Sequence, residues 1–183
     1  MPHEESQRSQ LSKAAASYYQ ERLKQAQEDK VRDDSLKKVV KAEEMPWENS
    51  PQGRIKHVMN ETTGARVKTV DAFILELPPG GRSGKHRHFA EECFFVLEGR
   101  GYDLHWDVDV ELKDKYYRKA QDKSQRFDWE EGDCVYIPVN TVHQHFNADA
   151  GKPARIICAT NRAYRLVGYG DIEQLENAPD YKP

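Results

Sequence analysis

The spacing of apolar side chains changes near residue 45. Before that point, apolar residues recur at steps of three and four, at Leu11, Ala15, Tyr18, Tyr19, Leu23 and Ala26. This spacing places them along one side of an α-helix. Oxygen-bearing side chains at residues 33–35 precede a second apolar group (Leu36, Val39, Val40) and predict a second short helix there. Residues 1–45 are therefore expected to form a helical arm that packs on its own domain or on a neighbouring subunit.

From residue 46 onward, short apolar runs of β type alternate with Pro, Gly, Asn and Asp. Candidate strands lie at residues 54–59, 72–77, around 85–88, 92–97, 102–112, 126–129, 134–138, 142–147 and 155–160. No helical pattern interrupts them. Many short strands separated by turns favour a mainly β antiparallel sandwich or barrel over an alternating α/β fold, so residues 46–183 are predicted to form one β-barrel domain.

Residues 102–112 show the clearest alternation of apolar and polar positions. One face carries Tyr102, Leu104, Trp106, Val108, Val110 and Leu112, and the other carries Asp103, His105, Asp107, Asp109 and Glu111. The pattern predicts a strand with the apolar face buried and the acidic face in solvent. Carboxylates two residues apart on a flat strand stand about 7 Å apart, so they are not expected to share one ion. The polar segment 113–125 is interpreted as a surface loop.

Composition and charge narrow the range of partners. Lys and Arg (28) nearly balance Asp and Glu (31), and the net charge is -3. No large basic surface for nucleic acid is implied, and the sequence has no signal-peptide pattern or membrane-spanning apolar run, so a cytoplasmic location is expected. Cys93, Cys134 and Cys158 each lie in an apolar string and are predicted to be reduced core residues.

The stretch KHRHFAEECFFVLEG concentrates metal-binding residue types. His86 and His88 are two residues apart, so an extended strand presents both imidazoles on one face while Arg87 points away. Glu92 follows after a turn and begins the next strand. A carboxylate can therefore return to the two imidazoles.

A second cluster lies in EGDCVYIPVNTVHQHFN. Gly132 and Pro138 bracket a strand, and His143, His145 and Asn147 alternate along the strand that returns. Three imidazoles and one carboxylate would fill four positions of an octahedral ion and leave two for substrate with dioxygen or water.

These clusters resemble the motifs of the cupins. The first cupin motif is glycine, five residues, His-x-His, three or four residues, Glu, six residues and glycine, and Gly80, His86, His88, Glu92 and Gly99 match all of it. The resemblance implies a double-stranded β-helix, a jelly-roll-like barrel, with a divalent metal held by His86, His88, Glu92 and His143.

The second cupin motif contains glycine, proline, a second glycine, His and Asn at fixed spacing. Gly132, Pro138, His143 and Asn147 match it, and Asn140 replaces the second glycine. Asn tolerates the left-handed backbone conformation better than most residues, so the turn is expected to persist.

Alternation also predicts which side chains surround the metal. Phe94 and Val96 should face inward, and His145 is expected to act as a hydrogen-bond partner of the site, a general base or a barrel filler. Candidate substrate-binding residues are Arg82, Arg87, Phe94, Tyr102, Trp106 and Tyr136; the two arginines, with Lys85, form a basic loop that could receive a carboxylate or stay in solvent. Cysteine dioxygenases, which resemble cupins, carry a cysteine shortly after their His pair but lack the motif glutamate. This chain keeps Glu92, and alternation turns Cys93 away from the metal, so Cys93 is expected to be a core residue.

Three function classes fit these residues. The first is an Fe(II) dioxygenase acting on a small anionic or aromatic metabolite; the ligand types also admit Mn, Zn, Ni and Cu. The second is a decarboxylase, lyase or isomerase in which the ion acts as a Lewis acid. The third is a ligand-binding cupin without turnover. An enzyme that forms a homodimer or higher homo-oligomer is expected, with the dioxygenase ranked first.

Overall fold

The computed structural model describes residues 2–112, 114 and 116–183, which divide into one compact unit ending at Lys38 and a second spanning Val39–Pro183. The division into a helical arm (1–45) and a barrel domain (46–183) stays a prediction. Among the described residues, no helix combines the length and apolarity needed to cross a bilayer.

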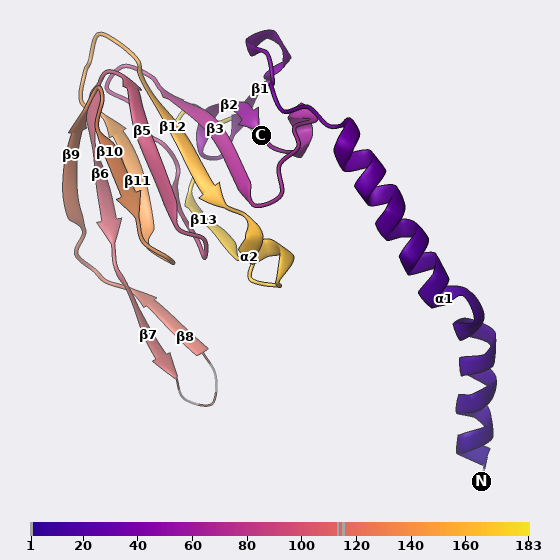
Figure 1. Ribbon diagram of the computed structural model, residues 1–183. Helices are drawn as coiled ribbons and strands as arrows, with labels where there is room; N and C mark the ends of the chain where they lie inside the picture. The colour runs from indigo at the N-terminus through magenta and orange to yellow at the C-terminus, as the bar shows by residue number, and fades with distance from the viewer. Residues whose placement is uncertain (1, 113, 115) are drawn as a thin grey trace. The chain divides into compact units, whose positions relative to one another are not determined.

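The first unit is a single α-helix, α1 (Pro2–Ser35), drawn in indigo in Figure 1. The second helix predicted to begin at residues 33–35 is wrong. The Ser35 hydroxyl donates back to the carbonyl of Arg32 (2.6 Å), so it does not cap a following helix, and the next helical element is the 3₁₀ turn η1 (Ala42–Glu44). Tyr18, Tyr19 and Leu23 of the predicted stripe are exposed.

The second unit contains two antiparallel sheets, which confirms the mainly β prediction. The six-stranded sheet has the order β1 (Trp47–Ser50), β2 (Gly53–Met59), β3 (Val70–Leu77), β12 (Ala154–Asn161), β5 (Glu92–Glu98), β10 (Cys134–Ile137). The five-stranded sheet has the order β13 (Ile172–Glu176), β4 (Lys85–His88), β11 (Val142–Asn147), β6 (Arg100–Trp106), β9 (Gln125–Glu130). The hairpin of β7 (Val108–Leu112) and β8 (Tyr116–Ala120) extends beyond the sheets (Figure 1), and η2 (Glu61–Thr63) and α2 (Ala163–Leu166) lie in connections.

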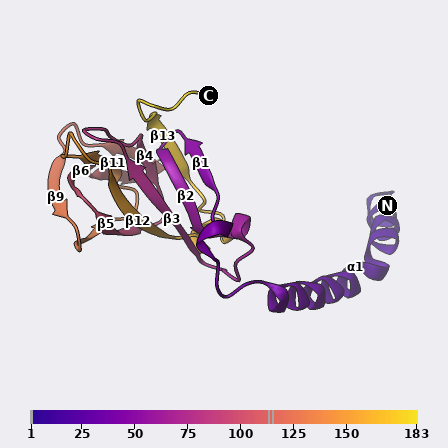
Figure 2. The same ribbon diagram turned by 90° about the horizontal axis from the view of Figure 1, so that it is seen from above.

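The hydrophobic core lies between the two sheets, which face each other in Figure 2. Its members are Leu75, Leu77, Phe94, Val96, Trp129, Ile137, Ala154, Ile156 and Cys158. Side chains alternate along β5, where Phe94 and Val96 are buried and Phe95 and Leu97 are exposed. The Phe94 and Trp129 rings meet edge to face at 6.0 Å and join the sheets.

The strand predicted over residues 102–112 differs from expectation in two ways. It breaks at Asp107 into β6 and β7, and the segment interpreted as a loop contains β8. Its face prediction is also wrong, because Asp103 (0% exposed) and His105 (5%) point inward. β11 pairs with β6, which sets Asp103 opposite His145 and His105 opposite His143, so the polar row faces other polar groups inside the barrel.

The outward aromatic rings of β6 are covered by neighbouring side chains. Tyr102 stacks on Phe146 at 4.7 Å, and the Arg126 guanidinium lies 3.7 Å from the Tyr102 ring centre. The Lys85 ammonium lies 3.8 Å from the Trp106 ring centre. Cation–π contacts of this kind stabilise an aromatic face that remains partly in solvent.

The cysteine prediction holds for one residue of three. Cys158 is buried, whereas Cys93 and Cys134 are exposed, so the core assignment is wrong for these two. Alternation does turn Cys93 away from the barrel interior, as predicted, but it lies on the outer face of the six-stranded sheet. Asn140 adopts φ +64°, the left-handed conformation expected of the residue that replaces the motif glycine.

Two neighbouring phenylalanines on β5 test the position of the core. Phe94→Ala removes a fully buried ring and is expected to lower the free energy of unfolding by about 3–5 kcal/mol. Phe95→Ala, on the outer face at 45% exposure, is the matched control and should cost less than about 1 kcal/mol. Urea unfolding of both variants measures the difference, and equal losses would contradict the assignment of faces.

Candidate metal centre

Strands β4 and β11 bring three imidazoles together inside the barrel. His86 and His143 are direct antiparallel partners, and their ring centres lie 4.2 Å apart. The His88 ring lies 5.6 Å from that of His86 and 5.1 Å from that of His143. His86 and His143 are buried, at 2% and 0% exposure.

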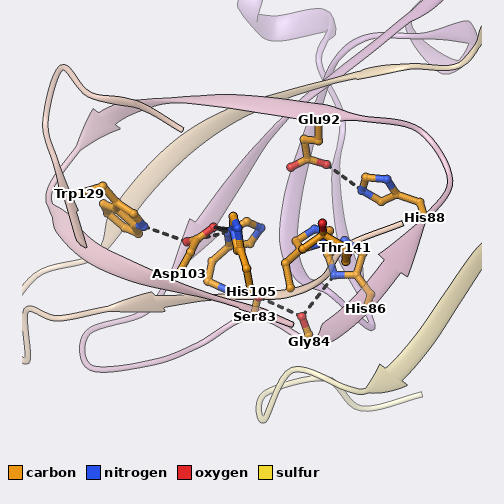
Figure 3. A network of polar contacts seen from close by, with 11 residues as sticks. Ser83, Gly84, His86, His88, Glu92, Asp103, His105, Trp129 and Thr141 are labelled. Carbon is orange, nitrogen blue, oxygen red and sulfur yellow. Dashed lines mark hydrogen bonds and ion pairs between the residues drawn. The ribbon is translucent and has the colours of Figure 1, made fainter. Parts of the chain in front are cut away.

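The opposite sheet contributes Glu92, the first residue of β5. Its side chain is buried, and Oε2 lies 3.1 Å from Nε2 of His88, as Figure 3 shows. Nδ1 of His88 lies 2.6 Å from the carbonyl of Ala90. The four sequence-predicted metal ligands thus converge from two strands of one sheet and one strand of the other.

Among the residues that the structure describes, three buried ligand atoms of this cluster have no hydrogen-bond partner. They are Nε2 of His86, Nε2 of His143 and Oε1 of Glu92. Nδ1 of His143 lies 2.9 Å from the carbonyl of Thr141, and Nδ1 of His86 lies 3.4 Å from that of Gly84. The carbonyls select the tautomers with the proton on Nδ1, which leaves the Nε2 lone pairs free, as in metal-binding histidines.

The donor atoms form two overlapping groups that could hold a metal ion. Within the described residues these groups are His86, His88 and His143, and Glu92, His143 and His145, with the ligand atoms of each group within 4.8 Å of one another. His143 belongs to both. Imidazole nitrogen and carboxylate oxygen suit Fe, Mn, Zn, Ni and Cu, so the residues fit a divalent transition-metal ion.

Burial keeps two of the imidazoles uncharged, with a single proton on each ring. It lowers the pKa of His86 to about 3, and repulsion from His88 adds to the effect. Burial also lowers the pKa of His143 well below its ordinary value, and His86 contributes in the same direction. Both rings are therefore neutral at neutral pH, the state that a metal ligand requires.

His88 and Glu92 each favour the charged form of the other. Burial, the largest single influence, acts to lower the pKa of His88, but the hydrogen bond to Glu92, its charge and the bond to the Ala90 carbonyl together raise the pKa. Burial acts most strongly to raise the pKa of Glu92, but the hydrogen bond from His88 and the charges of the nearby imidazoles together lower it. Because a metal ion must replace the proton on His88, binding is expected to release a proton.

Sequence reasoning missed a second buried pair beside the cluster. Both carboxylate oxygens of Asp103 lie 3.0 Å from Nδ1 of His145, and Oδ1 accepts a hydrogen bond from Nε1 of Trp129 at 2.9 Å. Nε2 of His105 lies 3.3 Å from Oδ2 (Figure 3). The only signal in the sequence is the alternation of Asp103 and His105, which fits either face of the strand.

Asp103 and His145 each favour the charged form of the other. Burial, the largest single influence, acts to raise the pKa of Asp103, but the charge of His145 and the hydrogen bonds from His105, His145 and Trp129 together lower it. Burial acts most strongly to lower the pKa of His145, but the charge of Asp103, its hydrogen bond and the charge of Glu92 together raise it. The His145 ring also meets the Phe94 ring edge to face at 5.2 Å.

Of the predicted substrate-binding residues, Phe94 lies inside the barrel, where its ring meets the ring of His145. Arg87 bonds to Asp171, Glu173 and Asn140, and the half-exposed Arg82 lines a separate cavity near β1. Tyr102 and Trp106 lie on the outer side of β6. The exposed Tyr136 lines a surface hollow whose other walls include Glu91, the candidate ligand Glu92 and Cys93.

A cavity of about 270 Å³ opens onto His88 and Glu92. Its other walls come from Phe73 of β3 and from the segment after β12, including Arg162, Arg165, Tyr164 and Tyr169. Sequence reasoning assigned no role to residues 161–172. Their place beside the metal ligands follows from the pairing of β13 with β4, which sets Ile172 opposite His88.

Comparison with known proteins places the chain in a family. A family model described as auxin binding protein matches residues 26–172. The chain belongs to the auxin-binding protein family. It is 27% identical over 120 residues to the tobacco auxin-binding protein T85, covering 65% of this chain and 60% of the tobacco protein. An uncharacterized protein of Methanocaldococcus jannaschii is 29% identical over 114 residues, covering 62% of this chain and 72% of that protein.

Solved structures confirm the cupin fold of this auxin-binding protein family member. A Lactobacillus farciminis oxalate decarboxylase, solved as a formate complex, superposes with a TM-score of 0.55 at 16% identity, covering 73% of this chain and 34% of the decarboxylase. A Bacillus subtilis oxalate decarboxylase variant gives 0.54 at 16% identity, covering 72% and 30%. The chain thus spans about a third of the decarboxylases and 60% of the tobacco relative.

The depressed pKa of His86 predicts how stability depends on pH in the metal-free protein. Unfolded histidine titrates near 6.5 and folded His86 near 3, so the unfolded state binds more protons between these values. The free energy of unfolding should therefore fall as pH falls from 6.5 to about 5, by about 1.4 kcal/mol per unit for each such histidine. His143 adds in the same direction.

Urea unfolding of chelator-treated protein at several pH values measures this slope. His86→Ala removes one of the contributing groups and should reduce the slope by about one proton. An unchanged slope in His86→Ala would contradict the account. His88 and His145 do not contribute to the slope between pH 6.5 and 5. Their pKa values are raised in the folded state, so the stability that they add is lost only as the pH rises above 6.5.

Proposed function

We propose that this protein is a metal-dependent cupin enzyme that holds one divalent ion through His86, His88, Glu92 and His143. The supporting observation is the set of three unpartnered buried atoms, Nε2 of His86, Nε2 of His143 and Oε1 of Glu92. Unpartnered buried polar atoms cost about 1–3 kcal/mol each, and a shared cation satisfies all three at once. When bound, such an ion supplies open positions at which substrate oxygen atoms and dioxygen are activated.

The chain's own groups hold and orient a proton beside these ligands. Asp103 fixes the His145 ring through Nδ1 and stabilises its charged form. Phe94 and Trp129 pack against the pair and exclude water from that side. His145 is thus the group we assign to proton transfer, with Asp103 as its positioning residue.

An Fe(II) dioxygenase acting on a small anionic or aromatic metabolite is the first candidate reaction. His86, His88, Glu92 and His143 would hold the ion, and an iron ion held by these ligands could take up both substrate and dioxygen. Non-redox decarboxylation or isomerisation is the second candidate, favoured by the buried proton carrier His145 and compatible with the fold shared with oxalate decarboxylases. Ligand binding without turnover is the third candidate, because the tobacco relative is named an auxin-binding protein. The experiment must distinguish it from an enzyme.

Oxygen consumption separates these candidates. Protein loaded anaerobically with Fe(II) is mixed with pools of small carboxylic and phenolic compounds in an oxygen electrode, and products are analysed by mass spectrometry. The dioxygenase predicts substrate-dependent oxygen uptake in step with product. Product without oxygen uptake assigns the non-redox reaction, and bound compound without product in any pool contradicts an enzyme.

Loss of either central imidazole should remove the metal. His86→Ala and His143→Ala are expected to lower metal content from about one ion per chain to below about 0.1, because imidazole ligands on a preformed site dominate affinity. His57→Ala is the matched control, since His57 bonds to Glu48 and Asn60 outside the cluster. Elemental analysis with circular dichroism as the fold check measures the effect. Full metal content in folded His143→Ala would refute the ligand assignment.

The proton-transfer pair makes a separate prediction. His145→Ala should keep the metal and lower kcat about 10²-fold or more on any substrate that the compound pools reveal, as expected for a lost general acid or base. Asp103→Asn keeps the shape of the side chain and should lower kcat with little change in metal content. Unchanged kinetics in His145→Ala would make His145 a packing residue.

A further inference from the structure

A buried arginine lies between two of the candidate metal ligands. Arg87 separates His86 from His88 on β4, so its side chain leaves the strand on the face opposite to theirs. That side chain is only 5% exposed. Within the described part of the chain its guanidinium makes five hydrogen bonds, as many as it has N–H donors. The proposed function gives this guanidinium no part, so its burial needs another explanation.

Two carboxylates fix the orientation of the guanidinium. Glu173 of β13 accepts from Nε of Arg87 at 3.3 Å and from Nη2 at 2.8 Å. Asp171, just before β13, accepts from Nη1 at 3.2 Å and from Nη2 at 3.5 Å. β13 pairs with β4, and Glu173 stands directly opposite Arg87 in the register. Because the guanidinium is planar, contacts on two of its sides hold it in one position.

The fifth bond reaches the turn that leads to His143. Nη1 of Arg87 donates to Oδ1 of the buried Asn140 at 3.0 Å. Asn140 has φ +64° and stands where the cupin motif has a glycine, which offers no side-chain acceptor. Its backbone N–H also donates to the carbonyl of His88 at 3.2 Å. Arg118 reaches the same Oδ1 only at 3.5 Å, so Arg87 is its principal donor.

The turn transmits this position to the ligand His143. Thr141 follows Asn140, and its carbonyl lies 2.9 Å from Nδ1 of His143. That carbonyl selects the tautomer with the proton on Nδ1 and leaves Nε2 for the metal. His86, the residue before Arg87, is the direct partner of His143 across the sheet. The bond from Arg87 to Asn140 therefore joins the strand that carries two ligands to the turn that orients the third.

We propose that Arg87 is a positioning residue, whose hydrogen bond to the Asn140 side chain fixes His143 relative to His86 and His88. The inference rests on the proposed function, because it concerns the geometry of the ligands assigned there. Removing a partner that orients a metal-binding histidine lowers metal affinity roughly 10–100-fold. If Arg87 served only to attach β13, its loss would lower stability and leave metal affinity unchanged.

Cobalt binding by matched variants tests this role. Co(II) is titrated into full-length, metal-free protein against a competing chelator to obtain Kd, and its visible absorption reports the coordination. Arg87→Gln and Asn140→Gly should each weaken Co(II) binding about tenfold or more and alter the absorption, because His143 loses its orientation. Asn140→Gly permits the positive φ and removes only the acceptor. Asn140→Asp, the conservative variant, keeps an acceptor at a tolerated φ and should restore the affinity.

Two further variants separate positioning from stability. Arg155→Gln removes an arginine that bonds to Glu76 and Glu98 on the other sheet, and it should leave the Co(II) Kd and absorption unchanged. The double variant Arg87→Gln with Asn140→Gly should lose less affinity than the sum of the single losses, because both remove the same bond. Losses that simply add, or a wild-type Kd in either folded single variant, would overturn the role of Arg87.

Nitrogen NMR of the imidazoles tests the same role without a metal. In chelator-treated wild type, the nitrogen shifts of His143 should show one tautomer, with the proton on Nδ1. Arg87→Gln and Asn140→Gly should mix the two tautomers, whereas Asn140→Asp and Arg155→Gln should not. A wild type that takes up no Co(II), with mixed tautomers in the two variants, would remove the proposed function and keep Arg87 as a positioning residue. One unchanged tautomer in both variants would overturn that role whatever the metal content.

Discussion

The structure depends on the burial of a polar layer between two apolar sheets. Neutral imidazoles at His86 and His143 and the pairs of Glu92 with His88 and Asp103 with His145 are buried inside the barrel. Burying unpaired charge is costly, and pairing each carboxylate with an imidazole offsets much of that cost. Some nitrogen and oxygen atoms of the layer remain without a partner among the described residues, and a cation would satisfy them.

Strand register is what assembles this layer. β4, β11 and β6 are neighbours in one sheet, so His143 faces His86 on one side and His105 on the other, and His145 faces Asp103. A shift of one residue in β6 would send Asp103 to the outer face and leave His145 without its partner. The metal ligands and the proton carrier are thus coupled through the same strand, β11, which supplies both His143 and His145.

The sequence was sufficient for the barrel and for the cluster of predicted ligands, because alternation and turn residues act locally. His86 and His88 share a face on any extended strand, and Glu92 follows within one turn. It was insufficient for Asp103, because an alternating strand does not indicate which face is inside. It was also insufficient for the cavity wall, since only the pairing of β13 with β4 brings residues 161–172 to the cluster. The core assignment of Cys93 and Cys134 failed because both side chains are exposed rather than in the core between the two sheets.

Membership of the auxin-binding protein family and the fold shared with oxalate decarboxylases agree with the cupin barrel. The central claim is that the buried polar layer holds a single metal ion. X-ray absorption spectroscopy at the edge of whichever metal is purified with the protein tests it most directly. The account predicts about one ion per chain with three imidazole ligands and only nitrogen and oxygen neighbours. Sulfur neighbours, fewer than two imidazoles or a chain that takes up no divalent ion would contradict it.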